Sequence, residues 1–244
     1  NVVLTDVTAA EAVLAVMGPN ARKLLQMVSP ADFSNDINPF GTAQEIEIGM
    51  ALARVHRVTY VGELGWEVYI SADMAGHVFE VLHAAGQQMG AKLCGMHMMD
   101  TCRIEKGFRH FGHDITAEDH ILEAGLGFAV KLDKPAFVGR DAVLRKKEAG
   151  LERRLVQFRL TDPEPLLYHN EPVLRDGKIV GQLSSGAYGH HFGAAMGMAY
   201  VPCAGQSVAD VLASSYEIDV AGRRYAAEVS LKPFYDPTGA RTKV

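Results

Sequence analysis

A glutamate and a tyrosine lie two residues apart in a segment rich in β-forming residues, and this pair could bind a ligand. The segment runs from Arg57 to Ile70 and reads Arg-Val-Thr-Tyr-Val-Gly-Glu-Leu-Gly-Trp-Glu-Val-Tyr-Ile. Its composition predicts a strand, a kink at Gly62 and Gly65, and a second strand. Side chains of a strand alternate, so Glu67 and Tyr69 share one face, and the apolar residues take the other: Trp66, Val68 and Ile70.

The chemistry of this face depends on how the carboxylate of Glu67 is satisfied. A carboxylate between Trp66 and Val68 is expected to be partly buried, and a buried carboxylate needs hydrogen-bond donors to offset its desolvation. A ligand with paired N–H donors, such as an aminopyrimidine ring, would meet that need. Two alternatives stay open: Glu67 faces solvent on a half-buried strand, or it forms a salt bridge with an arginine nearby in the fold.

A second group of candidate residues lies on a predicted helix from Gly95 to Lys106. Asp100 and Arg103 are one turn apart there. Arg103 could therefore pair within the helix with Asp100. It could instead meet a ligand anion, or orient a buried acid such as Glu67. Residue types alone leave these readings open.

Two histidine-containing stretches could also carry chemistry. Residues 109–114, with Asp119 and His120, hold side chains that bind zinc or iron, but no matching distal ligand set or His-Glu-x-x-His helix accompanies them. No metal site is predicted. The stretch from Tyr188 to His191 could perform acid–base catalysis; a hairpin loop is favoured, and no catalytic residue is assigned.

Composition bounds the class of protein. With 244 residues, 48% of them hydrophobic, the chain can form one large domain or two ordinary ones. A net charge of -5 argues against a nucleic-acid or anionic-membrane surface. No apolar run has the length of a membrane span. The cysteines, Cys94, Cys102 and Cys203, are too few and irregular for a disulfide framework, which favours a reducing compartment.

The order of predicted elements indicates an α+β fold. Helices are predicted at 21–28, 73–89 (N-capped by Asp73), 95–106 and 139–150, with strands at 43–59 and 123–132; residues 1–18 could be strand or helix. After a boundary near Gly150 the chain reads as short strands: 155–160, 172–175, 178–184, 194–201, 216–220 and 223–232. We therefore expect a mixed or antiparallel sheet with helices over 1–150, and a small antiparallel β-barrel over 151–244.

Several motifs resemble those of the aminomethyltransferase family, whose founder is the glycine cleavage T-protein. Tyr60-x-Gly-Glu-x-Gly-Trp-Glu67 looks like its folate-binding motif, and Asp100-x-x-Arg-x-Glu-x-Gly107 resembles its helix signature. Four further blocks resemble the C-terminal, folate-dependent region of dimethylglycine and sarcosine dehydrogenases: 108–114, 122–131, 137–141 and 184–191. The resemblance runs from about Val13 to the end of the chain.

This resemblance implies a function for a parent protein of which the chain is a part. Such a protein oxidises an N-methyl amine with FAD, held by a missing N-terminal region, and passes the one-carbon unit to tetrahydrofolate as 5,10-methylenetetrahydrofolate. Glu67 would bind the donor edge of the pterin, Tyr60 and Trp66 would line or stack on the ring, and Arg103 would supply positive charge. The implied location is a bacterial cytoplasm or the mitochondrial matrix.

Two features expected of the complete enzymes are missing from the sequence. The family's aspartate for one-carbon chemistry precedes the helix after Gly18, and Asp6 lies in the wrong surroundings to replace it. No Gly-x-Gly-x-x-Gly dinucleotide fingerprint is present either. The chain could therefore also be a fragment of a free-standing aminomethyltransferase, or a non-catalytic folate-binding module.

Overall fold

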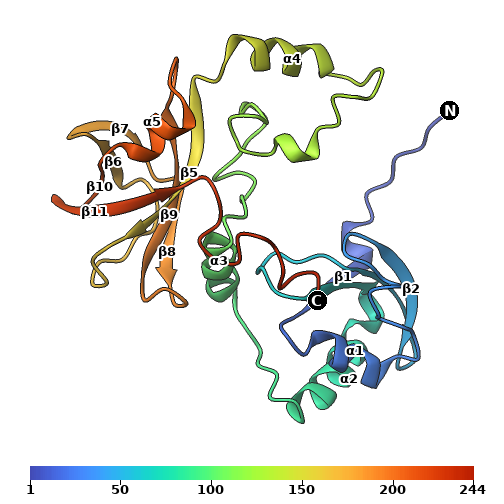
Figure 1. Ribbon diagram of the computed structural model, residues 1–244. Coiled ribbons are helices and arrows are strands. Elements are labelled where there is room, and N and C mark those ends of the chain that lie inside the picture. The colour runs from blue at the N-terminus through green and yellow to red at the C-terminus, as the bar shows by residue number, and fades with distance from the viewer. The chain divides into compact units, whose positions relative to one another are not determined.

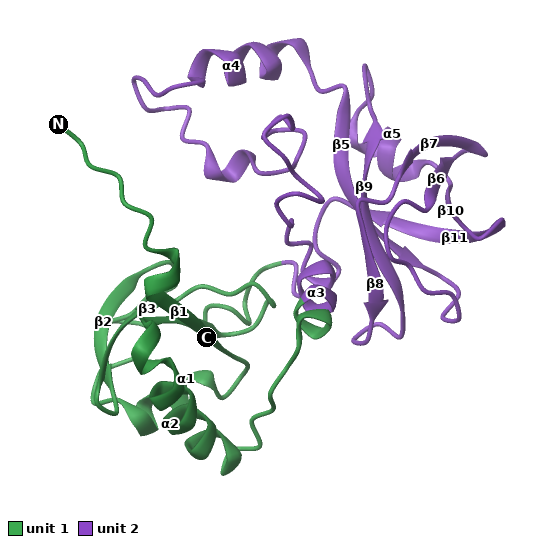
Figure 2. Ribbon diagram, turned by 180° about the vertical axis from the view of Figure 1, so that it is seen from behind, with its two compact units in different colours: residues 1–99, 238–244 green, residues 100–237 purple.

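The computed structural model describes residues 1–244, which divide into two compact units (Figure 2). Unit 1 comprises residues 1–99 together with 238–244, and unit 2 comprises residues 100–237. This division by contacts falls between residues 99 and 100, because residues 100–125 bind the strands of the C-terminal sheet and the residues beside them through side-chain hydrogen bonds. The domain boundary expected near Gly150 stays a prediction.

Unit 1 is a four-stranded antiparallel sheet with two helices against it (Figure 1). The strands follow the order β1-β4-β3-β2, and all three pairings are antiparallel. Their bounds are β1 Glu11–Met17, β2 Ala43–Ile48, β3 Ala51–His56 and β4 Gly65–Ser71. The helical elements are η1 Thr8–Ala10, α1 Ala21–Val28, η2 Ala72–Met74 and α2 Ala75–Gln87. The expected helix at 73–89 is thus confirmed, although Asp73 lies in η2 and does not cap it.

The core of unit 1 includes one face of β4, because every second side chain of this strand is apolar. Trp66, Val68 and Ile70 are buried and pack with residues of α1, α2 and the other strands. The opposite face of β4 carries Glu67 and Tyr69, both half-buried. The predicted alternation is therefore confirmed. The expected first strand of the motif is not present, because β3 ends at His56 and residues 57–64 form an irregular turn.

The sheet of unit 2 curls into a barrel. Its seven strands follow the order β7-β6-β10-β11-β5-β9-β8, with antiparallel pairings throughout, and β7 also contacts β9. The strand bounds are β5 Arg153–Leu160, β6 Pro172–Arg175, β7 Lys178–Gln182, β8 Ser185–Gly189, β9 Ala194–Pro202, β10 Tyr216–Val220 and β11 Arg223–Ser230. The expected α+β class with a small C-terminal antiparallel barrel is confirmed. Strand β8 and helix α5 (Val208–Ala213) were not expected from the sequence.

The segment before the barrel contains helix α3 (Met96–Glu105), the short helix η3 (Gly127–Ala129) and helix α4 (Arg140–Ala149). The expected strand at 123–132 is wrong. Gly125 has a φ of +69°, which is incompatible with a continuous extended strand. The Glu123 side chain is buried and forms ion pairs with Lys146 and Arg153. Helix α4 buries none of its residues, as expected for its basic face.

Two global features bear on the class of protein. The longest helix, α2, has 13 residues, and no helix qualifies as a candidate membrane span. All three cysteines are free thiols, with Cys94 exposed and Cys203 buried.

Candidate ligand-binding face on β4

Strand β4 presents a carboxylate and a phenol side by side on the face that lies away from the core. The hydroxyl of Tyr69 donates a hydrogen bond of 2.7 Å to Oε2 of Glu67. Both side chains are half-buried, and the side chains that alternate with them along β4 turn into the core. The bond engages only one carboxylate oxygen, so Oε1 of Glu67 keeps its acceptor capacity for another donor.

Neighbouring strands complete this face with small, aromatic and basic side chains. In the antiparallel register, Glu67 lies between Ala15 of β1 and His56 of β3. The imidazole of His56 packs on the ring of Tyr69 at 4.6 Å between centroids, and the guanidinium of Arg54 lies 5.4 Å from the same centroid. Glu67 therefore has a small residue on one side and the His56–Tyr69 ring pair on the other.

The surroundings of Glu67 decide between its alternative roles. No arginine forms an ion pair with Glu67, and Arg54 of β3 pairs instead with Glu11 at 3.4 Å. The salt-bridge alternative is therefore not observed. Glu67 is neither fully buried nor fully exposed, and its only donor within the chain is a neutral hydroxyl. A carboxylate so placed can accept paired N–H donors from a ligand without breaking an internal ion pair.

The Tyr69 hydroxyl reports on the charge of Glu67. The hydrogen bond to Glu67 raises the pKa of Tyr69, and burial and the charge of Glu67 act in the same direction. Replacing Glu67 with glutamine keeps an acceptor but removes the charge. We therefore expect the pKa of Tyr69 to fall in Glu67→Gln. The ultraviolet absorbance of tyrosinate, titrated in both proteins and corrected with Tyr69→Phe, measures this shift; an unchanged pKa would contradict the hydrogen bond.

Tyr60 lies in the turn that leads into β4. The hydroxyl of Thr59 accepts hydrogen bonds from the backbone N–H groups of Val61 and Gly62, which draws the chain out of the β3 ladder. Gly62 has a φ of +79°, so this turn requires the freedom of glycine, as predicted. Tyr60 is half-buried in unit 1, and its contribution to binding stays a prediction.

Trp66 is part of the core. Its exposed fraction is 0%, Phe33 packs against it edge-on at 5.5 Å, and its indole N–H donates to Oδ1 of Asn38. The guanidinium of Arg57 lies 5.5 Å from its ring centroid. No ring surface is left for a ligand, so this placement contradicts the expectation that Trp66 lines a ligand pocket or stacks on a bound ring. Trp66 fixes the strand that carries Glu67.

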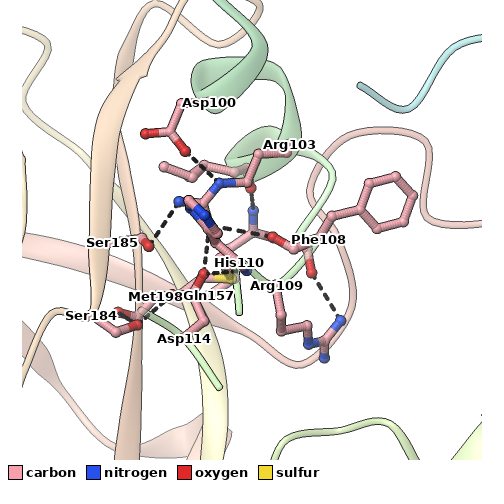
Figure 3. Close-up of polar contacts among 12 residues, drawn as sticks. Asp100, Arg103, Phe108, Arg109, His110, Asp114, Gln157, Ser184, Ser185 and Met198 are labelled. Carbon is pink, nitrogen blue, oxygen red and sulfur yellow. Dashed lines mark hydrogen bonds and ion pairs between the residues drawn. The ribbon is translucent and has the colours of Figure 1, made fainter. Parts of the chain in front are cut away.

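Arg103 lies in unit 2, whereas Tyr60, Trp66 and Glu67 lie in unit 1. The structure therefore brings three of the four predicted residues together in one unit. The side chain of Arg103 is only 2% exposed (Figure 3). Its Nε donates to Oδ1 of Asp100 at 2.6 Å, which is the expected pairing within the helix.

The other donors of Arg103 are also engaged, and they join helix α3 to the barrel. Nη1 donates to Oδ2 of Asp114 at 2.5 Å and to the carbonyl of Phe108, and Nη2 donates to the hydroxyl of Ser185 on β8 (Figure 3). Asp114 is fully buried and also accepts from Ser184 and the backbone N–H of His110. This network favours a positioning role for Arg103 rather than direct contact with a ligand anion.

The histidine-rich stretches lie in unit 2. The rings of His110 and His113 lie 4.7 Å apart between centroids in a tilted arrangement, while Asp114 forms an ion pair with Arg103. No group of three or more His, Cys, Asp or Glu side chains is arranged to hold a metal ion. Tyr188 is the last residue but one of strand β8, and His191 follows in the turn to β9, where its backbone N–H donates to a carboxylate oxygen of Glu105. The hairpin expected at residues 188–191 is thus observed.

Sequence reasoning missed His56 and Arg54, the side chains that flank Tyr69. Both belong to a predicted strand, but their position beside Glu67 follows only from the register of β3 with β4. Their alternation with buried Ala53, Val55 and Arg57 placed them on the solvent-side face, and that signal was available in the sequence.

Comparison with protein-family models divides the chain into two matched regions. Residues 1–134 match the GCVT N-terminal domain, and residues 153–236 match the glycine cleavage T-protein C-terminal barrel domain. The crystal structure of the glycine cleavage system aminomethyltransferase T from Bartonella henselae has a similar fold. It superposes with a TM-score of 0.79 at 24% identity, covering 93% of this chain and 60% of that one.

The similar proteins include an amine oxidase and amine dehydrogenases on the one hand and aminomethyltransferases on the other. The chain is 45% identical to 4-methylaminobutanoate oxidase (formaldehyde-forming) from Paenarthrobacter nicotinovorans and 36% identical to mitochondrial sarcosine dehydrogenase from Homo sapiens. The alignments cover 98% and 94% of this chain but only 28% and 25% of those proteins. It is also 35% identical to an aminomethyltransferase from Symbiobacterium thermophilum, over 96% of this chain and 62% of that protein.

Proposed function

Because the chain belongs to the glycine cleavage T-protein family, we propose that its β4 face binds tetrahydrofolate. The observation that carries the proposal is the half-buried carboxylate of Glu67, which has one neutral donor within the chain and one oxygen to spare. The pterin ring of folate presents an amino group and a ring N–H side by side. A carboxylate accepts such a pair through two parallel hydrogen bonds.

Each residue of the face has a role in this proposal. Glu67 accepts the paired donors of the pterin, and Tyr69 holds the carboxylate in one orientation through its hydroxyl. Tyr60, in the turn before β4, contacts the ring in this proposal. Bound tetrahydrofolate supplies N5 and N10, the nucleophiles that accept a one-carbon unit. The chain's own contribution is to position the ring and to exclude water.

Arg103 acts through its neighbours in this account. Its guanidinium is satisfied by Asp100, Asp114 and Ser185, so it holds helix α3 and the following loop to β8. It is a positioning residue, and its positive charge is already balanced within unit 2.

The names of the relatives support a proposal for the activity of a parent protein. We propose that the chain is the folate-binding part of a protein that oxidises an N-methyl amine and passes the one-carbon unit to tetrahydrofolate. Support comes from relatives named sarcosine dehydrogenase, dimethylglycine dehydrogenase and 4-methylaminobutanoate oxidase, which share N-methylated amino acids as substrates by name. The chain carries no dinucleotide fingerprint that fits FAD. Flavin chemistry would therefore belong to another region of such a protein.

A titration of a stable reduced folate into the chain by calorimetry tests the ligand. Saturable binding is expected, and Glu67→Gln should weaken it about 10- to 100-fold, because a charge-assisted hydrogen bond is worth roughly 1.5–3 kcal/mol. Glu47→Gln is the matched control, since Glu47 is an exposed carboxylate on β2 of the same sheet. Equal affinities for the Glu67 and Glu47 variants would remove Glu67 from the site.

A free-standing aminomethyltransferase is the second candidate, supported by the relative from Symbiobacterium thermophilum. The two candidates differ in what precedes residue 1 in the natural gene product. The amine-oxidising candidate requires an upstream Gly-x-Gly-x-x-Gly region for FAD. The second candidate requires instead the short opening part of the T-protein domain, with its aspartate, and a non-catalytic folate-binding module requires neither.

A further inference from the structure

A groove in unit 2 lies between helix α5 and the hairpin of strands β6 and β7 (Figure 1). Its volume of about 750 Å³ lies in the range of small-molecule sites. The lining residues are Arg175, Asp176, Lys178, Val180, Gln206, Asp210, Ala213 and Ser214. Four of them carry a charge, two of each sign, and only Val180 and Ala213 are apolar. The groove is therefore polar, and its charges are balanced overall.

Hydrogen bonds within the chain hold both walls of the groove. The turn between β6 and β7 has a φ of +51° at Asp176 and +78° at Gly177, as a tight hairpin turn requires. The Asp176 N–H donates to the Ser215 carbonyl at 2.9 Å, and the Ser215 N–H donates to Oδ1 of Asp176 at 3.0 Å. On the other wall, Ser207 and Asp210 form a capping box at the start of α5. The groove is thus built without a ligand.

Arg175 of β6 ties one wall to the other and keeps one donor free. Its Nε donates to the hydroxyl of Ser214 at 2.7 Å. Its Nη1 donates to Oε1 of Gln206 at 2.8 Å and to the Pro202 carbonyl at 3.0 Å, and its Nη2 donates to the Asp210 carbonyl at 3.2 Å. These acceptors are all uncharged groups. A guanidinium has five N–H donors, so one N–H of Nη2 is left over.

Two further side chains in the groove have spare donors. The ammonium group of Lys178 is exposed and forms no hydrogen bond or ion pair within the chain. The amide oxygen of Gln206 accepts from Arg175, whereas its amide nitrogen binds nothing. Together with Arg175 these side chains offer N–H donors, two of them cationic, to one region of the surface. Such a set suits an anionic group of a ligand.

The two carboxylates of the groove have spare acceptor oxygens. Asp176 uses Oδ1 for the Ser215 N–H, and Asp210 uses Oδ2 for the backbone and hydroxyl of Ser207. The other oxygen of each is unbound. Hydrogen bonds from Ser207 lower the pKa of Asp210, and the charge of Arg175 acts in the same direction, so this carboxylate is ionised at neutral pH. A pair of spare carboxylate oxygens suits a cationic group.

We propose that this groove binds the zwitterion of a small amino acid. The ligand carboxylate accepts from the spare donors of Arg175, Lys178 and Gln206. The ligand ammonium group donates to the spare oxygens of Asp176 and Asp210. A simple anion would meet the repulsion of two nearby carboxylates, and a simple cation that of two basic side chains, whereas a zwitterion satisfies both sets. This site is separate from the folate face, which lies in unit 1.

A titration of L-alanine, followed by NMR in the isotopically labelled 244-residue chain, tests the site. L-Lactate, with a hydroxyl in place of the ammonium group, and L-alaninamide, without the carboxylate, are the matched probes. The backbone signals of Asp176 and Ser215 report binding at the groove. We expect saturable shifts with alanine, and an affinity about 5-fold higher than for either probe, because each probe lacks one of the two charge contacts.

Two variants separate the halves of the site. Asp176→Asn keeps the acceptor for Ser215 and tolerates the positive φ, but removes a charge. It should weaken alanine binding about 2- to 5-fold and strengthen lactate binding. Lys178→Met should weaken both. Lys147→Met, an exposed lysine of α4 outside the groove, is the control and should change neither. Arg175 is not varied, because its hydrogen bonds hold α5 to β6.

Three results would overturn the proposal. The first is the absence of saturable shifts at Asp176 and Ser215 up to about 100 mM alanine. The second is equal affinity for alanine and lactate, which would remove the aspartates from the site. The third is equal affinity for alanine and alaninamide, which would remove the basic side chains. Reduced-folate binding and its dependence on Glu67 would stand whatever this titration gives, because Glu67 lies in unit 1.

Discussion

Replacing Asp114 with asparagine should lower the free energy of unfolding of unit 2 by about 3–5 kcal/mol, because it removes one partner of a buried ion pair. Asp114 is fully buried and binds Arg103, Ser184 and the backbone of His110. The asparagine side chain would present an amide where an acceptor is needed. The buried guanidinium of Arg103 would also lose half of its balancing charge.

Asp100→Asn is the matched control for this prediction. Asp100 binds the same guanidinium at 2.6 Å, but its side chain is 43% exposed, so water screens its charge and weakens the ion pair. We expect a loss of about 1 kcal/mol or less. Urea unfolding followed by circular dichroism measures both variants. Similar losses for the two would show that burial of Asp114 does not control the strength of the network.

Replacing Trp66 with alanine should lower the free energy of unfolding of unit 1 by about 3–5 kcal/mol, as for other buried large-to-small substitutions. The indole contacts Phe33, donates to Asn38 and packs over Arg57, and all of these contacts would be lost. Chemical unfolding followed by circular dichroism measures the effect.

Tyr69→Ala, on the opposite face of the same strand, should cost less because Tyr69 is half-buried. The comparison distinguishes a core residue from a ligand-binding one. If Trp66→Ala retained wild-type stability but lost reduced-folate binding, the assignment of Trp66 to the core would be wrong.

The local pattern of the sequence was sufficient to predict which side chains lie on each face of β4 and that a turn precedes this strand. Alternation placed Trp66 and Glu67 on opposite faces, and the positive φ of Gly62 fits the predicted kink. Alternation did not say which face a ligand would meet. A tryptophan beside the candidate glutamate was expected to contact the ligand, yet a side chain adjacent along a strand necessarily points to the other side of the sheet.

The partners of Arg103 could not be predicted from its helix. Asp100 is one turn away and was expected, whereas Asp114 follows a glycine-containing loop and Ser185 lies on a strand far along the chain. Strand β8 itself was missed because its sequence, Ser-Gly-Ala-Tyr-Gly, has low β-propensity and forms a strand only by pairing with β9. The groove between α5 and the β6–β7 hairpin likewise depends on tertiary contacts.

A crystal structure of the chain with a bound stable reduced folate tests the central claim most directly. The account predicts that both oxygens of Glu67 lie at hydrogen-bond distance, about 2.7–3.2 Å, from the paired N–H donors of the pterin, with the Tyr69 hydroxyl still bonded to Oε2. A folate bound elsewhere, with Glu67 contacting only Tyr69, would contradict it.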